Sequence, residues 1–438
     1  MADCTIKSFQ FSPLGRKMID CNFSGGSITS DGGGLLISET DKKFNVLSSF
    51  GALLSDSRHQ SYVAHSVSNM LTQRVYGIAL GYEDVNDHDR LRGDIAFQTM
   101  IGRHVDLASS ATLCRFENSA TREDCIALSK QIVEQFISSQ KSTPTELILD
   151  FDPTDNRIYG NQESRYYHGY YKNYCFLPLY VFCGDELLVS YLRPSNIDGA
   201  KHAGAILKFL VTRLRKAWPN VKITFRGDCA FARKRILYWC ENNNVKHIVG
   251  MPGNRRLKAK VKHLTYQAEQ QFERTQEPQK LYDEFSYAAD SWNKERRIIC
   301  KAEYNAQGSN TRFILTNDDD PDPESLYKDE YCMRGEMENK LKQMKLDLDS
   351  DRMSCSAFIA NQFRTLLSSL AYILINHLRK AGLQGTIYAK AYCNTIRLKL
   401  FKIGAVIIKN TRRIRCYFSS YYPHQKLFIN ILAKLKAT

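Results

Sequence analysis

Apolar and polar residues alternate along the chain with a period that changes from region to region, and each period predicts a type of secondary structure. Residues 1–40 are rich in Gly and Ser with short extended pieces, and they predict loops or a small hairpin. Residues 55–139 predict a mostly helical region, because apolar positions within 61–81 recur at three- and four-residue spacing. Those positions are Val63, Val67, Met70, Leu71, Val75, Ile78 and Ala79.

Short apolar runs of the length and composition of buried strands then follow. They cover residues 146–152, 170–183, 187–192, 221–225 and 246–251. Amphipathic helices are predicted at residues 199–217 and 231–242, between the later strands. Three adjoining strands followed by alternating helix and strand predict an α/β fold, with a mixed five-stranded sheet flanked by helices.

The pattern changes again after residue 252, where polar β-like pieces up to residue 323 predict a small antiparallel insertion. Long helices are predicted at residues 326–348 and 357–380. The chain is therefore expected to have five parts. They are a mainly helical domain (1–140), the first part of the sheet core (141–256), a β-rich insertion (257–325), the second part of the core (326–385) and a basic aromatic C-terminal segment (386–438).

The net charge of +15 is concentrated at the C-terminal end of the chain. Residues 352–438 hold 15 Lys and Arg and no Asp or Glu, so the remaining 46 basic residues balance the 46 acidic ones. Tyr and Phe are interleaved with these cations, which favours nucleic acid as the partner. An anionic membrane surface and a protein partner are the alternatives.

Membrane-spanning, secreted and zinc-finger classes are not expected. The most apolar run, residues 363–378, carries Arg364, Asn376 and His377 and is shorter than the roughly 20 residues of a membrane span. The N-terminal stretch MADCTIKSFQFS lacks the layout of a signal peptide, which predicts a cytoplasmic location. The 13 cysteines form no C-x-x-C pair, so a zinc site is not predicted.

The helix predicted at 326–348 carries four chemically active side chains at spacings of three, four and seven residues. Tyr331, Arg334, Glu338 and Lys345 fall within about 60° around the helix axis, at about 100° per residue. Glu336 points elsewhere. The alternative is an ordinary charged helix face stabilised by pairs four residues apart.

Acidic residues also stand at the ends of two predicted strands. Asp150 and Asp152 lie two residues apart on one strand and face the same side. Asp228 directly follows Gly227 at the end of the fourth strand, and carboxylates at neighbouring strand ends can converge in one crevice. Oxygen ligands without Cys or His favour Mg²⁺ or Mn²⁺. Each aspartate alone is also compatible with a turn or a helix cap.

These features together resemble a known family of enzymes. The element order resembles the RNase H-like catalytic core, and the placement of the acids resembles the DDE triad of integrases and transposases. The segment YCMRGEMENKLKQMK is similar to the Tyr-Arg-Glu-Lys signature of one group of insertion-sequence transposases, and LILDFDPTD, TFRGDCAF and RFILTN are similar to its other conserved blocks. The resemblance covers roughly residues 50–435 and includes a β-rich insertion before the last acid.

The resemblance implies a set of site residues. The triad would be Asp152, Asp228 and Glu338, which would hold two Mg²⁺ (or Mn²⁺) ions, with Asp150 the alternate first acid because Pro153 can bend the strand end. Tyr331, Arg334 and Lys345 would bind DNA phosphates. Trp292 in the insertion would stack a base displaced from the duplex, as an insertion tryptophan does in some relatives, although simple core packing is the alternative.

The function implied is metal-dependent DNA cleavage and strand transfer, the cut-and-paste transposition of a bacterial insertion sequence by a nucleoid-associated protein. The partners would be double-stranded DNA, as terminal inverted repeats and as target, and a second copy of the chain in a synaptic homodimer. The N-terminal helical region, with Arg74, Arg90 and Arg92, is a candidate for recognising the repeats or a purely structural cap. The alternatives are a catalytically inactive DNA-binding protein derived from a transposase and a repair or restriction nuclease on the same core.

Overall fold

The structure, a computed structural model, describes residues 8–437. Residues 1–7, part of the N-terminal stretch considered for a signal peptide, lie outside the described residues. The chain groups into two compact units. One combines the chain up to Ser119 with the chain from Leu370 onward, and the other is Ala120–Ser369.

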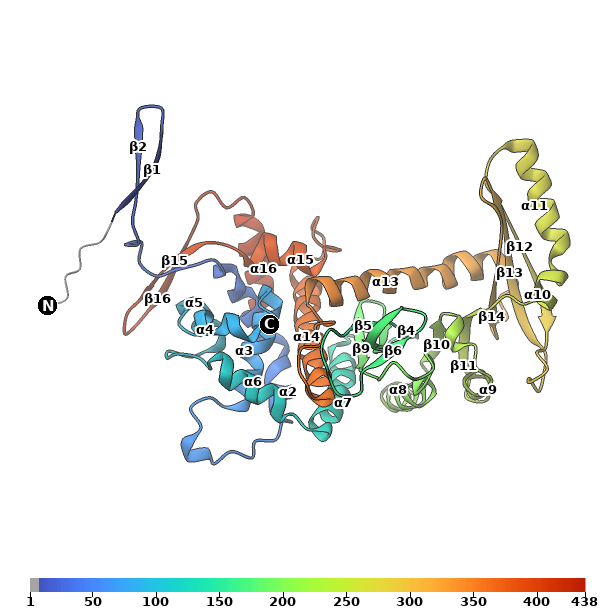
Figure 1. Ribbon diagram of the computed structural model, residues 1–438, viewed down its shortest axis with the longest axis horizontal. Coiled ribbons are helices and arrows are strands. Elements are labelled where there is room, and N and C mark those ends of the chain that lie inside the picture. Colours follow the sequence, from blue (N-terminus) through green and yellow to red (C-terminus); the bar gives the residue numbers. More distant parts are fainter. Residues whose placement is uncertain (1–7, 438) are drawn as a thin grey trace. The chain divides into compact units, whose positions relative to one another are not determined.

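The second unit is built on one mixed sheet, whose strands in spatial order are β12-β13-β14-β11-β10-β4-β8-β9 (Figure 1). Strand β10 runs parallel to both β4 and β11, and the other neighbours are antiparallel. The strands are β4 (Glu146–Pro153), β8 (Leu179–Cys183), β9 (Glu186–Tyr191), β10 (Lys222–Gly227), β11 (Val245–Met251), β12 (Gln279–Tyr287), β13 (Arg296–Asn305) and β14 (Gly308–Thr316).

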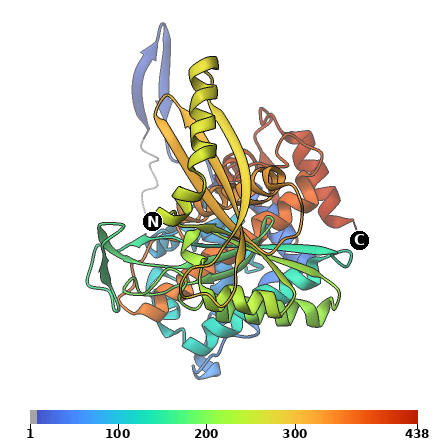
Figure 2. The ribbon, with the colours of Figure 1, turned by 90° about the vertical axis from the view of Figure 1, so that its right-hand side faces the viewer.

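Each of the five predicted core strands corresponds to a strand of this sheet, although only the second half of 170–183 does so, and the sheet does not end with them. β14 pairs antiparallel with β11, placing Leu315 opposite Val249, so the strands of the insertion extend the core sheet to eight. The prediction of a five-stranded sheet was therefore wrong in the number of strands, whereas the predicted antiparallel insertion is present. Figure 2 shows the insertion strands together with helix α11.

Helices cover the face of this sheet that holds the main core. They are α7 (Arg122–Ser139), α8 (Ala203–Ala217), α9 (Lys234–Asn242), α10 (Arg255–Lys260) and α11 (Lys262–Thr275). Leu149 and Phe151 of β4 point into this core, so the alternate residues Asp150 and Asp152 face the other side of the sheet. The sequence thus predicted the pairing of the two aspartates on one face correctly.

The opposite face carries the helical run that was predicted at 326–348. Its Leu326 and Tyr327 pack against Ile248, Ile299 and Ile314 of the sheet. The run is not a uniform α-helix. It consists of α12 (Pro323–Ser325), a π-helical turn (Leu326–Tyr331), a 3₁₀ turn (Cys332–Arg334), α13 (Gly335–Lys342) and a second π turn (Gln343–Asp347).

Helix α14 (Phe358–Leu378) continues into a π turn (Arg379–Leu383). Its Gln362 holds the edge of the sheet, accepting from the Leu192 amide at 2.6 Å and donating to the Ser190 carbonyl at 3.1 Å. Among the described residues, Phe358–Leu383 is the one helix long and apolar enough to cross a membrane, but 83% of its most apolar window is buried inside the protein, as in a core helix.

A separate three-stranded sheet lies between β4 and β8 along the chain. It consists of β5 (Asn156–Arg157), β7 (Asn173–Phe176) and β6 (Tyr166–His168), in that spatial order. The single strand predicted at 170–183 was therefore wrong, because its first half belongs to this small sheet and its second half is β8.

The first unit is mainly helical with two small sheets. The hairpin predicted within 1–40 is present as β1 and β2, and helix α3 starts at Val67, where the Ser66 hydroxyl accepts from the Asn69 amide at 3.2 Å. Its elements are β1 (Phe9–Leu14), β2 (Lys17–Cys21), β3 (Ile28–Thr29), α1 (Leu35–Phe44), α2 (Val46–Gly51), α3 (Val67–Leu80), α4 (His88–Leu91), α5 (Ile95–Ile101), α6 (Ser110–Ser119), α15 (Cys393–Ile396), β15 (Ala405–Lys409), β16 (Ile414–Phe418) and α16 (Gln425–Lys436).

Candidate active site

Asp150 is engaged in a buried ion pair. The guanidinium of Arg226, its neighbour on β10, donates from Nε to Oδ1 at 2.5 Å and from Nη2 to Oδ2 at 2.8 Å. Arg226 also donates to the carbonyl of Glu330, which attaches the helical run to the sheet. Both charges of the pair are almost fully buried. Asp150 is therefore neutralised by a structural partner, which leaves Asp152 as the better candidate for a first acid.

Asp152 lies at the end of β4 with its carboxylate mostly buried and 3.8 Å from Nη1 of Arg334. The pKa of Asp152 is raised to about 7, chiefly by burial and further by the charges of Asp228, Glu338 and Asp150, while Arg334 opposes the rise. The acids on three elements are thus close enough to influence one another.

Asp228 begins the loop after β10. Its carboxylate accepts from the amide of Ala230 at 2.9 Å and caps the short 3₁₀ turn Cys229–Phe231. Burial raises the pKa of Asp228, and Arg334 and Arg233 partly offset this effect. The capping interpretation considered for Asp228 is therefore realised, and it does not remove the residue from the neighbourhood of the other two acids.

Glu338 stands on α13 with 58% of its side chain exposed, and its Oε1 lies 3.8 Å from Nη2 of Arg334. Arg334 consequently has Asp152 on one side and Glu338 on the other, and Asp228 adds to the negative field that raises the Arg334 pKa against the effect of burial. One guanidinium is therefore shared by carboxylates from β4, the end of β10 and α13.

These residues suit a divalent cation by their chemistry. All three acids offer oxygen donors, and a mostly buried carboxylate whose pKa is raised by its acidic neighbours gains from added positive charge. Asp152, Asp228 and Glu338 are the residues that would hold the cation. Within residues 8–437, however, no three such side chains lie together as closely as a bound ion requires, so the carboxylates surround Arg334 without yet converging.

The other residues of the helical stripe also face the strand ends. Tyr331 is mostly buried, and its hydroxyl lies so close to Gly250 that an added Cβ there would approach it to 2.7 Å. Lys345 reaches the residues just after Asp152, with Nζ 2.6 Å from the Asp155 carbonyl and 3.3 Å from the Thr154 hydroxyl. The stripe predicted from the sequence is thus brought to one edge of the sheet.

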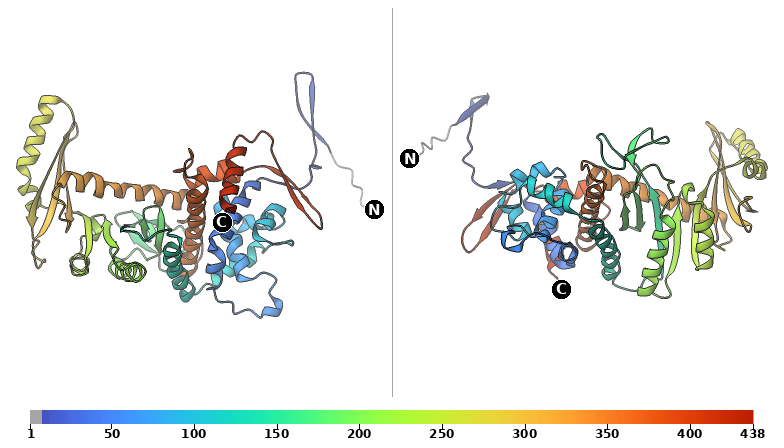
Figure 3. Two further views of the ribbon diagram at one scale, coloured as in Figure 1. Left: turned by 180° about the vertical axis from the view of Figure 1, so that it is seen from behind. Right: turned by 60° about the horizontal axis from the view of Figure 1, so that its bottom comes forward.

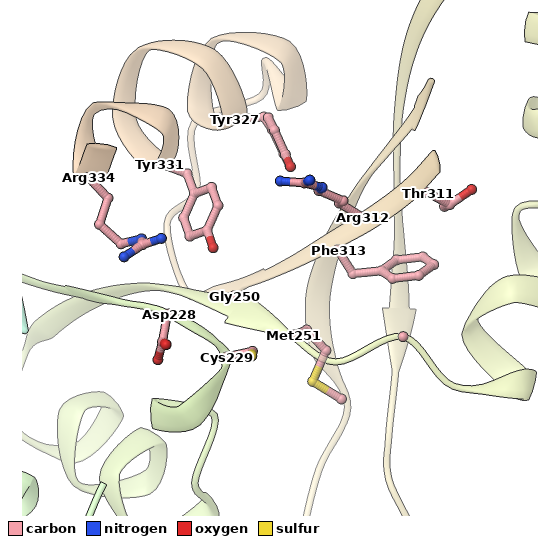
Figure 4. Close-up of a pocket in the computed structure, with 11 residues that line it drawn as sticks. Asp228, Cys229, Gly250, Met251, Thr311, Arg312, Phe313, Tyr327, Tyr331 and Arg334 are labelled. Atoms are coloured by element: carbon pink, nitrogen blue, oxygen red, sulfur yellow. The ribbon is translucent and has the colours of Figure 1, made fainter. Parts of the chain in front are cut away.

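A cavity of about 280 Å³ opens beside Asp228. Figure 4 shows Tyr331 and Arg334 extending from the helical run toward the loop that holds Asp228, with Arg312 and Phe313 of β14 on the far side. Of the three acids, Asp228 lines this cavity, together with residues of the insertion. The insertion residues Arg312 and Phe313 were not singled out from the sequence, because nothing in a strand pattern shows which end of β14 meets the acids.

Trp292 does not line this cavity. It packs at the edge of the main core, with its ring 5.8 Å from the Tyr287 ring and the Arg296 guanidinium 4.9 Å above it. The core alternative considered for Trp292 therefore describes its environment, and its stacking on DNA has no support from this position.

Arg74 cannot recognise DNA repeats. It is fully buried and its Nε donates to Glu117 at 2.6 Å, so the sequence interpretation was wrong for this residue. Helical spacing does not reveal a buried partner 43 residues away. Arg90 is exposed, whereas Arg92 is half-buried with Asp106 at 3.4 Å.

Comparison with known proteins identifies the chain. No curated protein matches it. Among solved structures, the cryo-EM structure of a piggyBac transposase synaptic complex with hairpin DNA is similar at 12% sequence identity and a TM-score of 0.39, over 84% of this chain and 79% of that one, a likeness too weak to argue from. The family described as transposase DDE domain group 1 matches residues 11–438. Because this match spans nearly the whole sequence, the chain belongs to the transposase DDE domain group 1 family.

Proposed function

We propose that this transposase cleaves DNA at the ends of an insertion sequence and joins the freed ends to a target, in cut-and-paste transposition. The observation that carries the proposal is the sharing of Arg334 by Asp152 and Glu338, with Asp228 beside them. Two Asp and one Glu from distant parts of the chain surround Arg334, and these are the residue types that the family's DDE name leads one to expect.

The strand arrangement supports an RNase H-like core for this proposal. The first five sheet strands in chain order lie spatially as β9-β8-β4-β10-β11, with β4 parallel to β10 and antiparallel to β8. In this order Asp152 and Asp228 lie at the same end of adjacent parallel strands. The helical run that carries Glu338 covers the face of the sheet toward which Asp152 points.

Each residue has a defined role in this proposal. Two Mg²⁺ or Mn²⁺ ions held by Asp152, Asp228 and Glu338 would supply Lewis-acid activation of the attacking oxygen and stabilisation of the leaving 3′ oxygen. Arg334 and Tyr331 bind the phosphate oxygens next to the cleaved bond, and Lys345 holds the β4 end in place through Asp155. Water cleaves the strand first, and the 3′-hydroxyl that is released then attacks the second strand or the target.

Terminal inverted repeats and target DNA are the proposed substrates, and two copies of the chain would bring a pair of ends together. The exposed basic hairpin of β15 and β16, which carries Arg412, Arg413 and Arg415, supports contact with the phosphate backbone.

The test is strand cleavage of a duplex that carries the element's own ends. Glu338→Gln is expected to abolish Mg²⁺-dependent nicking while the affinity for the same duplex stays within about twofold, because the substitution removes one charge from an exposed side chain. The matched control is Glu336→Gln, an exposed acid two residues away on the same helix, which should nick like the wild type. Normal nicking by Glu338→Gln would refute the proposed role, and cleaved ends that never join a target would favour a plain nuclease.

A further inference from the structure

A tyrosine-rich segment follows Asp152 along the chain, and cleavage by the three acids does not by itself require it. Residues 155–176, named the tyrosine arm, contain the small sheet of β5, β6 and β7. The arm holds six of the 24 tyrosines of the protein within 22 of its 438 residues. This density calls for a physical explanation, because tyrosine does not favour a loop by itself. The arm is visible as the green projection in the right panel of Figure 3.

The tyrosine rings of the arm lie on its surface. The exposed fractions are 89% for Tyr159, 83% for Tyr170, 57% for Tyr167 and 47% for Tyr174. The other apolar side chains of the arm, Ile158, Cys175 and Phe176, are all buried. The exposed surface is therefore aromatic and hydroxylated without exposed aliphatic groups. Such a surface offers flat ring faces on which nucleobases can stack.

The cationic side chains of the arm are exposed or lie over a surface ring, whereas its two acidic side chains are paired with groups of the protein. Arg157 and Lys172 are exposed, and the Arg165 guanidinium lies 4.8 Å above the Tyr174 ring. Asp155 receives Lys345 at 3.5 Å, and Glu163 accepts from the Phe358 amide at 2.9 Å. The charges presented to a ligand are therefore positive, as a phosphate backbone requires.

The arm is anchored next to the candidate active site. It leaves β4 three residues after Asp152, and Lys345 of the helical run donates to the Asp155 carbonyl at 2.6 Å. At the turn before β7, the Tyr171 ring lies 4.9 Å from the His168 ring and 5.0 Å from the Tyr170 ring. Burial raises the pKa of Tyr171, and the charges of Asp155, Asp152 and Asp228 raise it further, so this ring lies near the acids.

We infer that the tyrosine arm binds the DNA strand next to the cleaved bond, by stacking unpaired bases on its exposed rings while Arg157 and Lys172 contact the phosphates. The inference rests on the proposed function, since it places the bound strand beside the bond that the acids cleave. The ligand is a strand whose bases are out of the duplex, because base faces are available for stacking only there.

The experiment measures affinity separately from cleavage. Two fluorescent duplexes carrying the element end are compared in EDTA, one fully paired and one with four unpaired bases flanking the cleavage position. Tyr159→Ala and Tyr170→Ala are each expected to weaken binding of the unpaired duplex by about tenfold, and to change binding of the paired duplex less than about twofold. The Tyr→Phe versions keep the ring and should bind like the wild type. Tyr238→Ala, at a 52% exposed tyrosine on α9, is the matched control and should have no effect.

The outcomes distinguish the role of the tyrosine arm from the proposed cleavage activity. Unchanged affinity of both alanine variants, with wild-type cleavage intact, overturns the inference and leaves the proposed function standing. A change in oligomeric state by sedimentation, without a change in DNA affinity, overturns it too and makes the arm a protein contact. If the wild type does not cleave at all, the proposed function fails, and the placing of the arm beside a cleaved bond fails with it.

Discussion

Two aspartates two residues apart on β4 show how neighbours determine the chemistry of identical side chains. Asp150 and Asp152 face the same side of the sheet, but Asp150 has Arg226 beside it within hydrogen-bonding distance. Asp152 has only the shared Arg334 at 3.8 Å, and other acids nearby. The Asp150–Arg226 ion pair is therefore stable without a ligand, whereas the surroundings of Asp152 favour the binding of a further positive charge.

Substituting each aspartate should separate these roles. Asp152→Asn is expected to abolish Mg²⁺-dependent nicking with the fold intact. Asp150→Asn leaves Arg226 buried without its counter-charge, and should lower the free energy of unfolding by about 3 kcal/mol while residual nicking persists at low temperature. Urea unfolding and a cleavage assay at 15 °C measure both effects. Loss of cleavage by Asp150→Asn at wild-type stability would instead make Asp150 the first acid.

The raised pKa of Asp152 gives the protein a pH-dependent stability. An aspartate in the unfolded chain ionises near pH 4, and Asp152 in the folded protein ionises near pH 7. The folded state therefore binds the proton more tightly, so the free energy of unfolding falls as pH rises between about 4 and 7 and is constant above. The fall attributable to this group is at most about 4 kcal/mol.

Comparing the two proteins checks this dependence. In EDTA, urea unfolding between pH 5 and 8 should show a decline for the wild type that is reduced in Asp152→Asn. Parallel curves for the two proteins would contradict the assignment of the raised pKa to Asp152.

At this scale the resemblance gave Asp152 as the first acid and Asp150 as the alternate, and the residue pattern of the strand itself does not separate the two. Strand alternation places both on one face, and only the position of Arg226, 76 residues away in the chain, distinguishes them. Arg74 shows the same limit, because its partner Glu117 is likewise distant in sequence. Partners of buried charges are decided by tertiary packing, which spacing along one element does not encode.

At the scale of elements, the helical run 323–347 changes type four times along its length. A uniform rotation of about 100° per residue predicted one stripe for the four signature residues. In the structure Arg334 lies at the end of a 3₁₀ turn and Lys345 in a π turn, so the stripe follows the sheet edge past Asp152 to Asp155. Glu336, which the spacing places off the stripe, is exposed on α13.

Two glycines of this region are expected to respond oppositely to alanine. A Cβ at Gly250 would meet the Tyr331 hydroxyl at 2.7 Å and the backbone nitrogen of Cys229 at 2.9 Å, so Gly250→Ala should destabilise the fold by about 1–3 kcal/mol and slow cleavage. A Cβ at Gly335 meets nothing within 4 Å, and Gly335→Ala should stabilise by about 0.5–1 kcal/mol. Thermal unfolding and nicking rates of the two variants test this. A Gly250→Ala variant that is as stable as the wild type and nicks at the same rate or faster would exclude the close approach of Tyr331 to Gly250.

Other elements were predicted incompletely for a physical reason. Helix α11 was missed because it is short of apolar residues and buries only Leu264 and Ala268, within a region whose β-like pieces dominated the pattern. The strands of the insertion were recognised by their composition, whereas their union with the core sheet depends on pairing between β14 and β11, which are separated by the 56 residues between Met251 and Gly308. Local patterns give the elements, and partners distant in sequence give their arrangement.

At the scale of the whole molecule, the charge of the chain predicts how binding responds to salt. The exposed arginines at the end of the β15–β16 hairpin, Arg412, Arg413 and Arg415, are the densest cations of the acid-free C-terminal segment. Replacing all three with Gln should weaken duplex binding and reduce the slope of log affinity against log salt by about 2–3. The slope is measured by anisotropy between 50 and 300 mM salt. An unchanged slope would show that this hairpin does not touch the backbone.

The pairing of β14 with β11 determines where residues can be deleted from the insertion without exposing the edge of the sheet. A sheet that stopped at β11 would leave Ile248, Val249 and the unpaired amides of that strand open to strands of other chains, a template for aggregation. The insertion thus protects a vulnerable border as well as carrying Arg312 toward the acids. Shortening of the β13–β14 turn near Gly308, where an added Cβ would meet nothing within 4 Å, is expected to be tolerated, whereas loss of β14 itself is expected to make the protein aggregate.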